Sequence, residues 1–176
     1  MRQLDDDGPR SVRNAYAGDE ERPLGGYLAA LGTYAAGVGA LAGAARLRGR
    51  RLPEKFSLGD TVLLSIATHK LSRLVAKDAV TSPLRAPFTR YEEPAGDGEV
   101  NESVRGHGIR HSVGELISCP FCMAVWIATA LTGGMVLAPR LTRAVTVVMT
   151  AVASSDLLQL VYDSAKELPS AVGAAH

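Results

Sequence analysis

Two long stretches without any charged residue constrain this chain more than any other feature of its sequence. No charge lies between Arg22 and Arg46, and none lies between Glu115 and Arg140. A helix of about 20 residues crosses the roughly 30 Å hydrocarbon layer of a bilayer, so each stretch can span a membrane. A water-soluble helix of this length would need an extensive polar face, which residues 24–45 lack. We therefore predict that lipid surrounds these two segments.

The full pattern of apolar blocks predicts an all-α, multi-span helical membrane protein with three to four transmembrane helices, one of them partly amphipathic. We expect a membrane domain at residues 23–165, between a flexible polar tail at 1–22 and a short polar tail at 166–176. Its helices are predicted at about residues 24–46, 57–80, 115–138 and 141–163, with an extramembrane loop at 81–114. We expect a multi-pass protein of the plasma membrane. The formal net charge of +1 gives no strongly basic field that would attract nucleic acid.

The second predicted helix changes character along its length. The motif Ser57-Leu-Gly-Asp60 is typical of a capped helix start, and the residues that follow it are apolar. Basic residues then recur every four positions, at His69, Arg73 and Lys77, and so share one face. The helix is predicted to be half membrane span and half amphipathic surface helix. Its basic stripe, which also includes Lys70 and which Arg85 could continue, is expected to contact anionic lipid head groups.

Residues 81–114 are predicted to form a loop because Pro83, Pro87 and Pro94 exclude a continuous helix. Glycines at 96, 98, 106 and 108 mark turns within it. The orientation in the membrane stays open at this point. The preference of Lys and Arg for the cytoplasmic side places both residues 46–55 and residues 70–90 inside, and both can be inside only if the second helix does not cross.

Asp156 interrupts the fourth apolar block, where a carboxylate is costly unless it is paired, neutralised or directed into a polar cavity. Its expected partners are the basic residues of the second helix: His69, Lys70, Arg73 and Lys77. Two interpretations are open: a structural ion pair that fixes helix packing, and a role in transport or proton relay.

Cys119-Pro-Phe-Cys122 is the sharpest local motif. A helix N-terminus stabilises a thiolate, and proline is favoured at the first helical position. Three interpretations are open: small apolar residues packed at a helix start, a redox or structural disulfide, and a metal site completed by His107 and His111. The motif follows no strand, so a thioredoxin fold is excluded. We expect no cofactor.

Three motifs in order resemble one bacterial membrane-protein family. They are His69-Lys-Leu-Ser-Arg73-Leu-Val-Ala-Lys-Asp78, Thr81-Ser-Pro-Leu-Arg85-Ala-Pro-Phe88, and Gly114-Glu-Leu-Ile-Ser-Cys-Pro-Phe-Cys122 with Trp126. Together they make the chain similar, over about residues 58–162, to the family called domain of unknown function 1360. The resemblance implies a small multi-span membrane protein and supplies no activity. His107 and His111 lie outside the family's pattern, which weakens the metal interpretation.

No motif in the sequence identifies an enzyme, and three functions remain open. The first is a non-enzymatic scaffold or partner-modulating subunit, which would use the small residues of the first helix, including Gly39 and Gly43, to bind a membrane protein or a second copy of itself. The second is a membrane-anchored thiol–disulfide protein that acts through Cys119 and Cys122. The third is a small transporter or lipid-binding protein built around Asp156 and the basic stripe.

Overall fold

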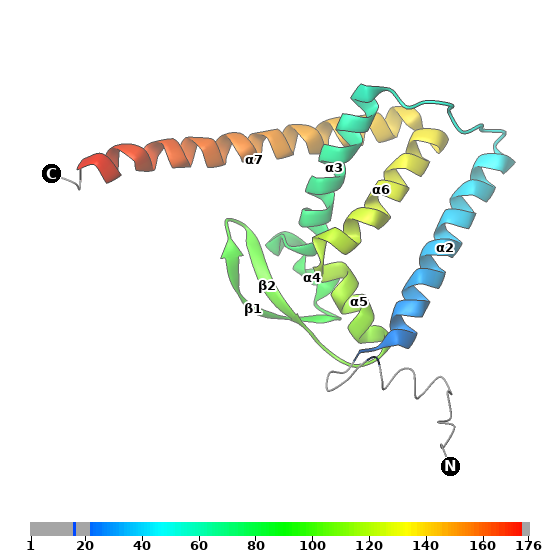
Figure 1. The fold of residues 1–176 in the computed structure, drawn as a ribbon, viewed down its shortest axis with the longest axis horizontal. Coiled ribbons are helices and arrows are strands. Elements are labelled where there is room, and N and C mark those ends of the chain that lie inside the picture. The colour runs from blue at the N-terminus through cyan, green and yellow to red at the C-terminus, as the bar shows by residue number, and fades with distance from the viewer. Residues whose placement is uncertain (1–15, 17–21, 174–176) are drawn as a thin grey trace, which may run out of the picture.

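The computed structural model describes Tyr16 and residues 22–173, and most of these residues are helical (Figure 1). The predicted polar tail at 1–22 lies almost entirely outside the described residues. The elements are α2 (Leu24–Leu47), α3 (Leu58–Ala76), η1 (Ala79–Thr81), α4 (Ser82–Arg85), β1 (Thr89–Gly96), β2 (Glu99–Val104), α5 (Ile109–Ser118), α6 (Pro120–Leu137) and α7 (Pro139–Gly173).

Among the described residues, three helices are long and apolar enough to cross a membrane, which confirms the predicted fold class. They are α2, α6 and the Pro139–Lys166 part of α7. Within each span only 6% of the residues are buried by the rest of the chain. Leu28 and Leu31 on α2, for example, are 69% and 65% exposed. Because burying such side chains is favourable and the chain itself does not cover them, contact with lipid explains the pattern.

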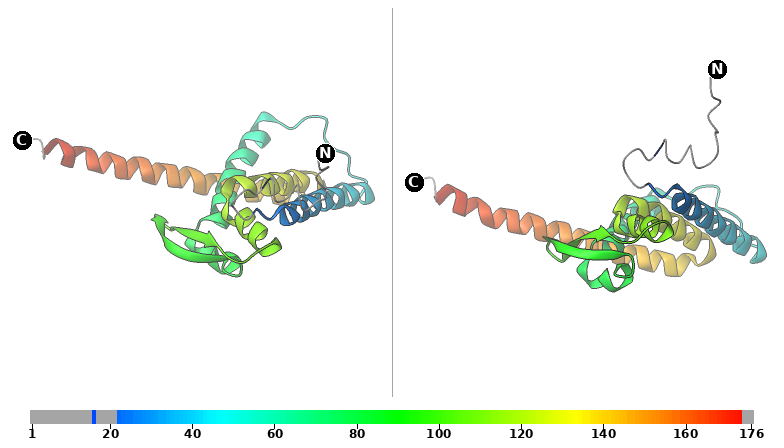
Figure 2. Two further views of the ribbon diagram at one scale, coloured as in Figure 1. Left: turned by 60° about the horizontal axis from the view of Figure 1, so that its bottom comes forward. Right: turned by 90° about the horizontal axis from the view of Figure 1, so that it is seen from below.

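The long helices alternate in direction, so the bundle has two distinct ends (Figure 1). We call the end where α2 and α6 begin the head end, and the end where they finish the base end. At the head end, the Tyr27 hydroxyl of α2 donates to Glu115 of α5 over 2.7 Å. At the base end, Arg143 of α7 donates to Asp60 of α3 over 3.0 and 3.1 Å. From there α7 crosses α3, which it contacts extensively, and its second half projects beyond the other helices (Figure 1 and Figure 2).

The second predicted helix begins as expected and ends early. Ser57 caps it, since the Asp60 backbone N–H donates to the Ser57 hydroxyl over 3.0 Å. The helix finishes at Ala76 instead of continuing to residue 80. α3 is not among the helices apolar enough to span, because its second half carries the basic stripe. It packs instead between α6 and α7, the two helices with which it makes its most extensive contacts.

The predicted loop at 81–114 is wrong in detail, because most of it is regular structure. β1 and β2 form an antiparallel hairpin in which Thr89 pairs with Val104 and Gly96 with Glu99. Gly96 and Gly98 adopt positive φ at its tip, as the turn requires. All of β1 after Thr89 is exposed, so the strand lacks the alternation of buried and exposed residues that signals a strand in a sequence.

The third and fourth predicted helices also need correction. Residues 115–138 do not form one helix: α5 ends at Ser118, Cys119 has extended backbone, and α6 starts at Pro120. Proline has no N–H to donate and disfavours helical conformation in the residue before it, so the chain breaks at Cys119. The fourth helix begins at Pro139 and continues to Gly173, which places helix where residues 166–173 were expected to be a polar tail.

Candidate functional site

Arg85 lies at the centre of the head end, where its side chain is fully buried. All three guanidinium nitrogens donate hydrogen bonds. The acceptors are the Glu102 carboxylate (2.8 and 3.1 Å), the Val75 carbonyl (2.7 Å), the Thr81 hydroxyl (2.7 Å), the Asp78 carbonyl (3.0 Å) and the Ser82 hydroxyl (3.2 Å). One side chain therefore joins the end of α3, the η1–α4 segment and strand β2. The expectation that Arg85 continues a lipid-facing surface is wrong, because burial and a complete set of partners remove it from the surface.

Glu102 is the counter-charge of Arg85, and its side chain is 6% exposed. Burial raises the pKa of this carboxyl, but hydrogen bonds from Arg85 and Thr89 and the charge of Arg85 outweigh burial and bring the pKa below its ordinary value. Glu102 therefore stays ionised at neutral pH. The two opposite charges, with their hydrogen bonds, form a buried ion pair that fixes the hairpin to the end of α3.

A second ion pair holds the tip of the hairpin beside α3. Arg73 donates to Glu99 Oε1 from Nε over 2.9 Å and to Oε2 from Nη2 over 2.5 Å. Both partners are more accessible than Arg85 and Glu102, at 43% and 20% exposed. Backbone bonds extend the same junction, since Val100 N–H donates to the Lys77 carbonyl and Ala79 N–H to the Gly98 carbonyl. Two residues of the basic stripe therefore hold the hairpin, Arg73 through its side chain and Lys77 through its backbone carbonyl.

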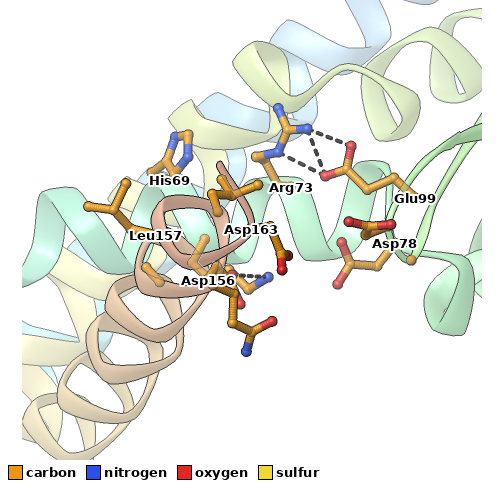
Figure 3. A pocket seen from close by; sticks show the side chains of 13 residues that line it. His69, Arg73, Asp78, Glu99, Asp156, Leu157 and Asp163 are labelled. Atoms are coloured by element: carbon orange, nitrogen blue, oxygen red, sulfur yellow. Dashed lines mark hydrogen bonds and ion pairs between the residues drawn. The ribbon is translucent and has the colours of Figure 1, made fainter. Parts of the chain in front are cut away.

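Asp156 is paired with Lys70, at 2.9 Å between Nζ and Oδ2. This pair lies in a cavity of about 550 Å³ between α3, α7 and the hairpin tip (Figure 3). His69 and Arg73 also line the cavity, whereas Lys77 does not. The charged lining comprises His69, Lys70, Arg73, Asp78, Asp97, Glu99, Asp156 and Asp163. Sequence reasoning missed Glu99 here because it lies 26 residues from Arg73, across a hairpin that the sequence did not reveal.

Cys119 caps α6, as the motif predicts: the Cys122 backbone N–H donates to Cys119 Sγ over 3.4 Å. Both thiols are free, with Cys119 half-buried and Cys122 exposed. Burial raises the pKa of the Cys119 thiol, but hydrogen bonds from Cys122 and Phe121 and the nearby charge of Lys77 outweigh it, so the pKa lies below its ordinary value. The arrangement favours a thiolate at this position.

The proposed His2Cys2 metal set does not assemble. His111 instead approaches Glu115 one turn along α5, at 3.4 Å, and the Gly106 carbonyl at 3.3 Å. Among the residues that the structure describes, no three His, Cys, Asp or Glu side chains are grouped closely enough to hold a metal ion. His107 and His111 lie around the start of α5, and Cys119 and Cys122 follow its end, so most of the length of this helix separates the two pairs.

One face of α2 packs against α6, whereas the glycines Gly39 and Gly43 face open space within the described chain. Tyr34 packs edge-on against Trp126 of α6 with ring centroids 5.2 Å apart, and hydrogen bonds to Thr129 over 2.7 Å. Gly39 and Gly43 lack such packing, because a methyl group added at either position would meet nothing within 4 Å. The GxxxG spacing of α2 is therefore not used to pack this helix within the described chain.

Comparisons with known proteins place these features in a family. The sequence profile of a family described as "Protein of unknown function (DUF1360)" matches residues 63–162. The chain is also 41% identical over 70 residues to "Sporulation protein YjcA" of Bacillus subtilis (strain 168), a match that covers 38% of this chain and 59% of the relative. No solved structure matches at a significant level. The matched residues include most of α3, the buried Arg85 network and the Cys-Pro-Phe-Cys motif, and the chain belongs to the DUF1360 family of proteins of unknown function.

Proposed function

We propose that the chain is a non-enzymatic membrane protein that presents a rigid extramembrane head to a partner protein. The head comprises η1, α4, the hairpin and α5, residues 79–118. The observation that carries this proposal is the buried Arg85–Glu102 pair, which locks the hairpin onto the end of α3. A buried ion pair is a poor source of net stability compared with apolar packing, and its best-attested use is to specify one arrangement. Fixed geometry is what a recognition surface requires.

The outward face of the hairpin has the composition of a polar recognition surface. Tyr91 is 58% exposed, and Glu92 and Glu93, which follow it in β1, are exposed as well. Cross-strand bonds order this face, since Asn101 donates to Glu93 over 3.3 Å and Ser103 donates to Glu92. An exposed tyrosine ordered among charged residues is the kind of anchor that protein interfaces enrich.

The name of the relative, sporulation protein, refers to a process and names no binding partner. The match covers 59% of that relative's length. The open glycines of α2 offer a second contact surface, within the membrane, to a partner helix or a second copy of the chain. Gly39→Leu and Gly43→Leu should disrupt such an assembly in detergent extracts while leaving the monomer folded, since a side chain at these positions enters open space.

Site-specific photo-crosslinking tests the proposal. A benzophenone amino acid at Tyr91 should yield one discrete adduct in cells, and the same probe at Leu141, an exposed base-end residue, should not. The decisive comparison uses two anchoring variants. Glu102→Gln should loosen the hairpin and reduce the adduct, whereas Glu99→Gln, which removes only the more exposed pair, should retain most of it. A smear of adducts, or equal yields at both positions, would contradict recognition by the head.

A thiol–disulfide role is the second candidate, supported by the capped position of Cys119. The Cys119 thiolate would attack a partner disulfide, forming a mixed disulfide and releasing one partner thiolate. The Cys122 thiol, on losing its proton, would then attack Cys119 Sγ and release the second partner thiolate, which leaves an oxidised Cys119–Cys122 pair and a partner reduced by two electrons. Mass-tag alkylation before and after reduction tests this role. Thiols that stay reduced in cells and react slowly at neutral pH would count against it.

A further inference from the structure

We infer that the base end of the bundle is a docking surface for anionic lipid head groups, and that it faces the cytoplasm. The surface consists of Arg46, Arg48, Arg50, Arg51, Lys55 and Arg140, which we call the basic rim. All six residues are exposed. They lie on the end of α2, on the linker to α3 and at the start of α7, which meet at one end of the bundle (Figure 1).

The basic rim lacks the acidic partners that neutralise the basic residues of the head end. Among the described residues, the base end offers Asp60, which Arg143 already occupies, and Glu54. No ion pair within the described chain involves a residue of the rim. Residues 70–118, by contrast, hold seven Lys and Arg and seven Asp and Glu, and pair Arg73 and Arg85 internally. Uncompensated positive charge is therefore concentrated at the base.

Exposed apolar side chains are interleaved with these charges. Leu47 is 92% exposed, Leu52 is 79% exposed and Phe56 is 39% exposed. They alternate along the linker with Arg48, Arg50 and Lys55, a mixture that neither plain water nor the hydrocarbon interior accommodates. The boundary of a bilayer accommodates both, because apolar side chains enter the acyl region while guanidinium groups bind phosphate.

The basic rim also indicates which way the chain is oriented in the membrane, a question that the sequence left open. The cytoplasmic leaflet carries the anionic lipids and the negative surface potential that attract Lys and Arg near the membrane. The short α2–α3 linker also fits the cytoplasmic preference of Lys and Arg in loops. The conflicting preference of residues 70–90 weakens once Arg73 and Arg85 are seen in ion pairs and Arg85 is buried. The head end then lies on the opposite side of the membrane.

Lipid selectivity can be measured on the full chain in detergent. Glu54→Cys, placed within the rim in a Cys119→Ser/Cys122→Ser background, is labelled with bimane and titrated in dodecyl maltoside micelles with nitroxide-labelled phosphatidylglycerol or phosphatidylcholine. We expect preferential quenching by phosphatidylglycerol. Arg50→Gln/Arg51→Gln should weaken its apparent affinity about 25-fold, or about fivefold per arginine. The matched control, Arg90→Gln/Arg105→Gln at the head end, should leave it unchanged.

Equal quenching by the two lipids, or an equal loss in the control, would overturn the lipid assignment. So would displacement of phosphatidylglycerol by a short oligonucleotide, which would mark the rim as a nucleic-acid surface. Orientation is tested with a membrane-impermeant maleimide on intact cells. Glu93→Cys on the hairpin should label at once, and Glu54→Cys only after the membrane is opened. The reverse order would overturn the cytoplasmic placement.

Discussion

The Arg85–Glu102 pair yields the most demanding prediction, because its cost can be worked out from its surroundings. Glu102→Gln keeps the size of the side chain but removes the charge that faces a fully buried guanidinium. Breaking a buried pair by changing one partner typically costs about 3–5 kcal/mol, since the remaining charge is left without compensation. The amide oxygen can still accept one hydrogen bond, so we expect about 3 kcal/mol, the lower end of that range.

The control for this prediction is the second ion pair of the hairpin. Glu99→Gln removes the partner of Arg73, whose side chain is 43% exposed, so solvent can take over its charge. Pairs of this kind are worth about 0–1 kcal/mol. Both variants change a glutamate to glutamine, and both glutamates belong to β2, so they differ mainly in burial.

Hydrogen exchange of hairpin amides, followed by mass spectrometry in detergent micelles, reports the local free energy of opening. A loss of about 3 kcal/mol should lower the protection of residues 89–104 by about two orders of magnitude in Glu102→Gln. The loss in Glu99→Gln should be about fivefold or less. The double variant Arg85→Met/Glu102→Met should recover much of the protection, because apolar replacement of both partners is often nearly neutral. Equal protection in the two single variants would refute the reasoning.

The same pair predicts how hairpin protection depends on pH. The pKa of Glu102 is lowered in the folded chain, so the unfolded segment binds a proton more readily. The stabilisation is therefore fully present above the unfolded pKa of about 4.3 and is lost as the pH falls through the folded pKa. After correction for intrinsic exchange rates, wild-type protection should be constant near neutrality and fall below about pH 4. Glu102→Gln should lack most of this decrease.

Three further predictions concern other parts of the bundle. Gly114→Ala should lower the melting temperature in detergent by several degrees, because the added methyl group would lie 2.9 Å from the Phe88 carbonyl oxygen. The control, Gly39→Ala, places its methyl group in open space and should be neutral or stabilising. Asp156→Asn should destabilise the folded chain by about 1 kcal/mol in an unfolding titration, and Lys70→Met in the same chain should offset this loss, as expected of a structural pair. Cys119 should react with iodoacetamide at pH 7 faster than an unperturbed thiol, and alkylation that is no faster than that of free cysteine would contradict its lowered pKa.

The helical framework is predictable because its signals are local. Charge-free blocks locate the spans around Leu28 and Trp126, and the Ser57 cap sets the start of α3. Pro120 is the first residue of α6, and proline causes a break in the helix at the residue before it. The charge-free block continues across this break without any change in composition, so the sequence predicts α5 and α6 as one helix. Helix ends are the least specified part of such predictions, since α7 continues through residues with no apolar periodicity.

The head is not predictable because it depends on register. Gly96-Asp-Gly98 is recognisable as a turn, but Asp-Gly is a strong hairpin signal only when alternating strands flank it. The outer strand is exposed almost throughout, so no alternation marks it. Without the hairpin, Glu102 cannot be placed opposite Arg85, and an arginine without a partner is naturally assigned to the surface. The partner of Asp156 is predictable as one of a few basic residues, since one stretch of helix holds them all.

The two ends of the bundle link the proposed orientation to the chemistry of Cys119. This thiol lies at the head end, beside Lys77 and opposite the basic rim. If the rim faces the cytoplasm, Cys119 faces the compartment where disulfides persist, and a lowered thiol pKa there favours exchange with an oxidised partner. If the rim faces outward, the same thiol meets the reducing cytosol, where disulfides that can accept electrons from the pair are rare and transient. The order in which Glu54→Cys and Glu93→Cys label therefore decides whether the second candidate function has a chemical basis, independently of whether the head binds a partner.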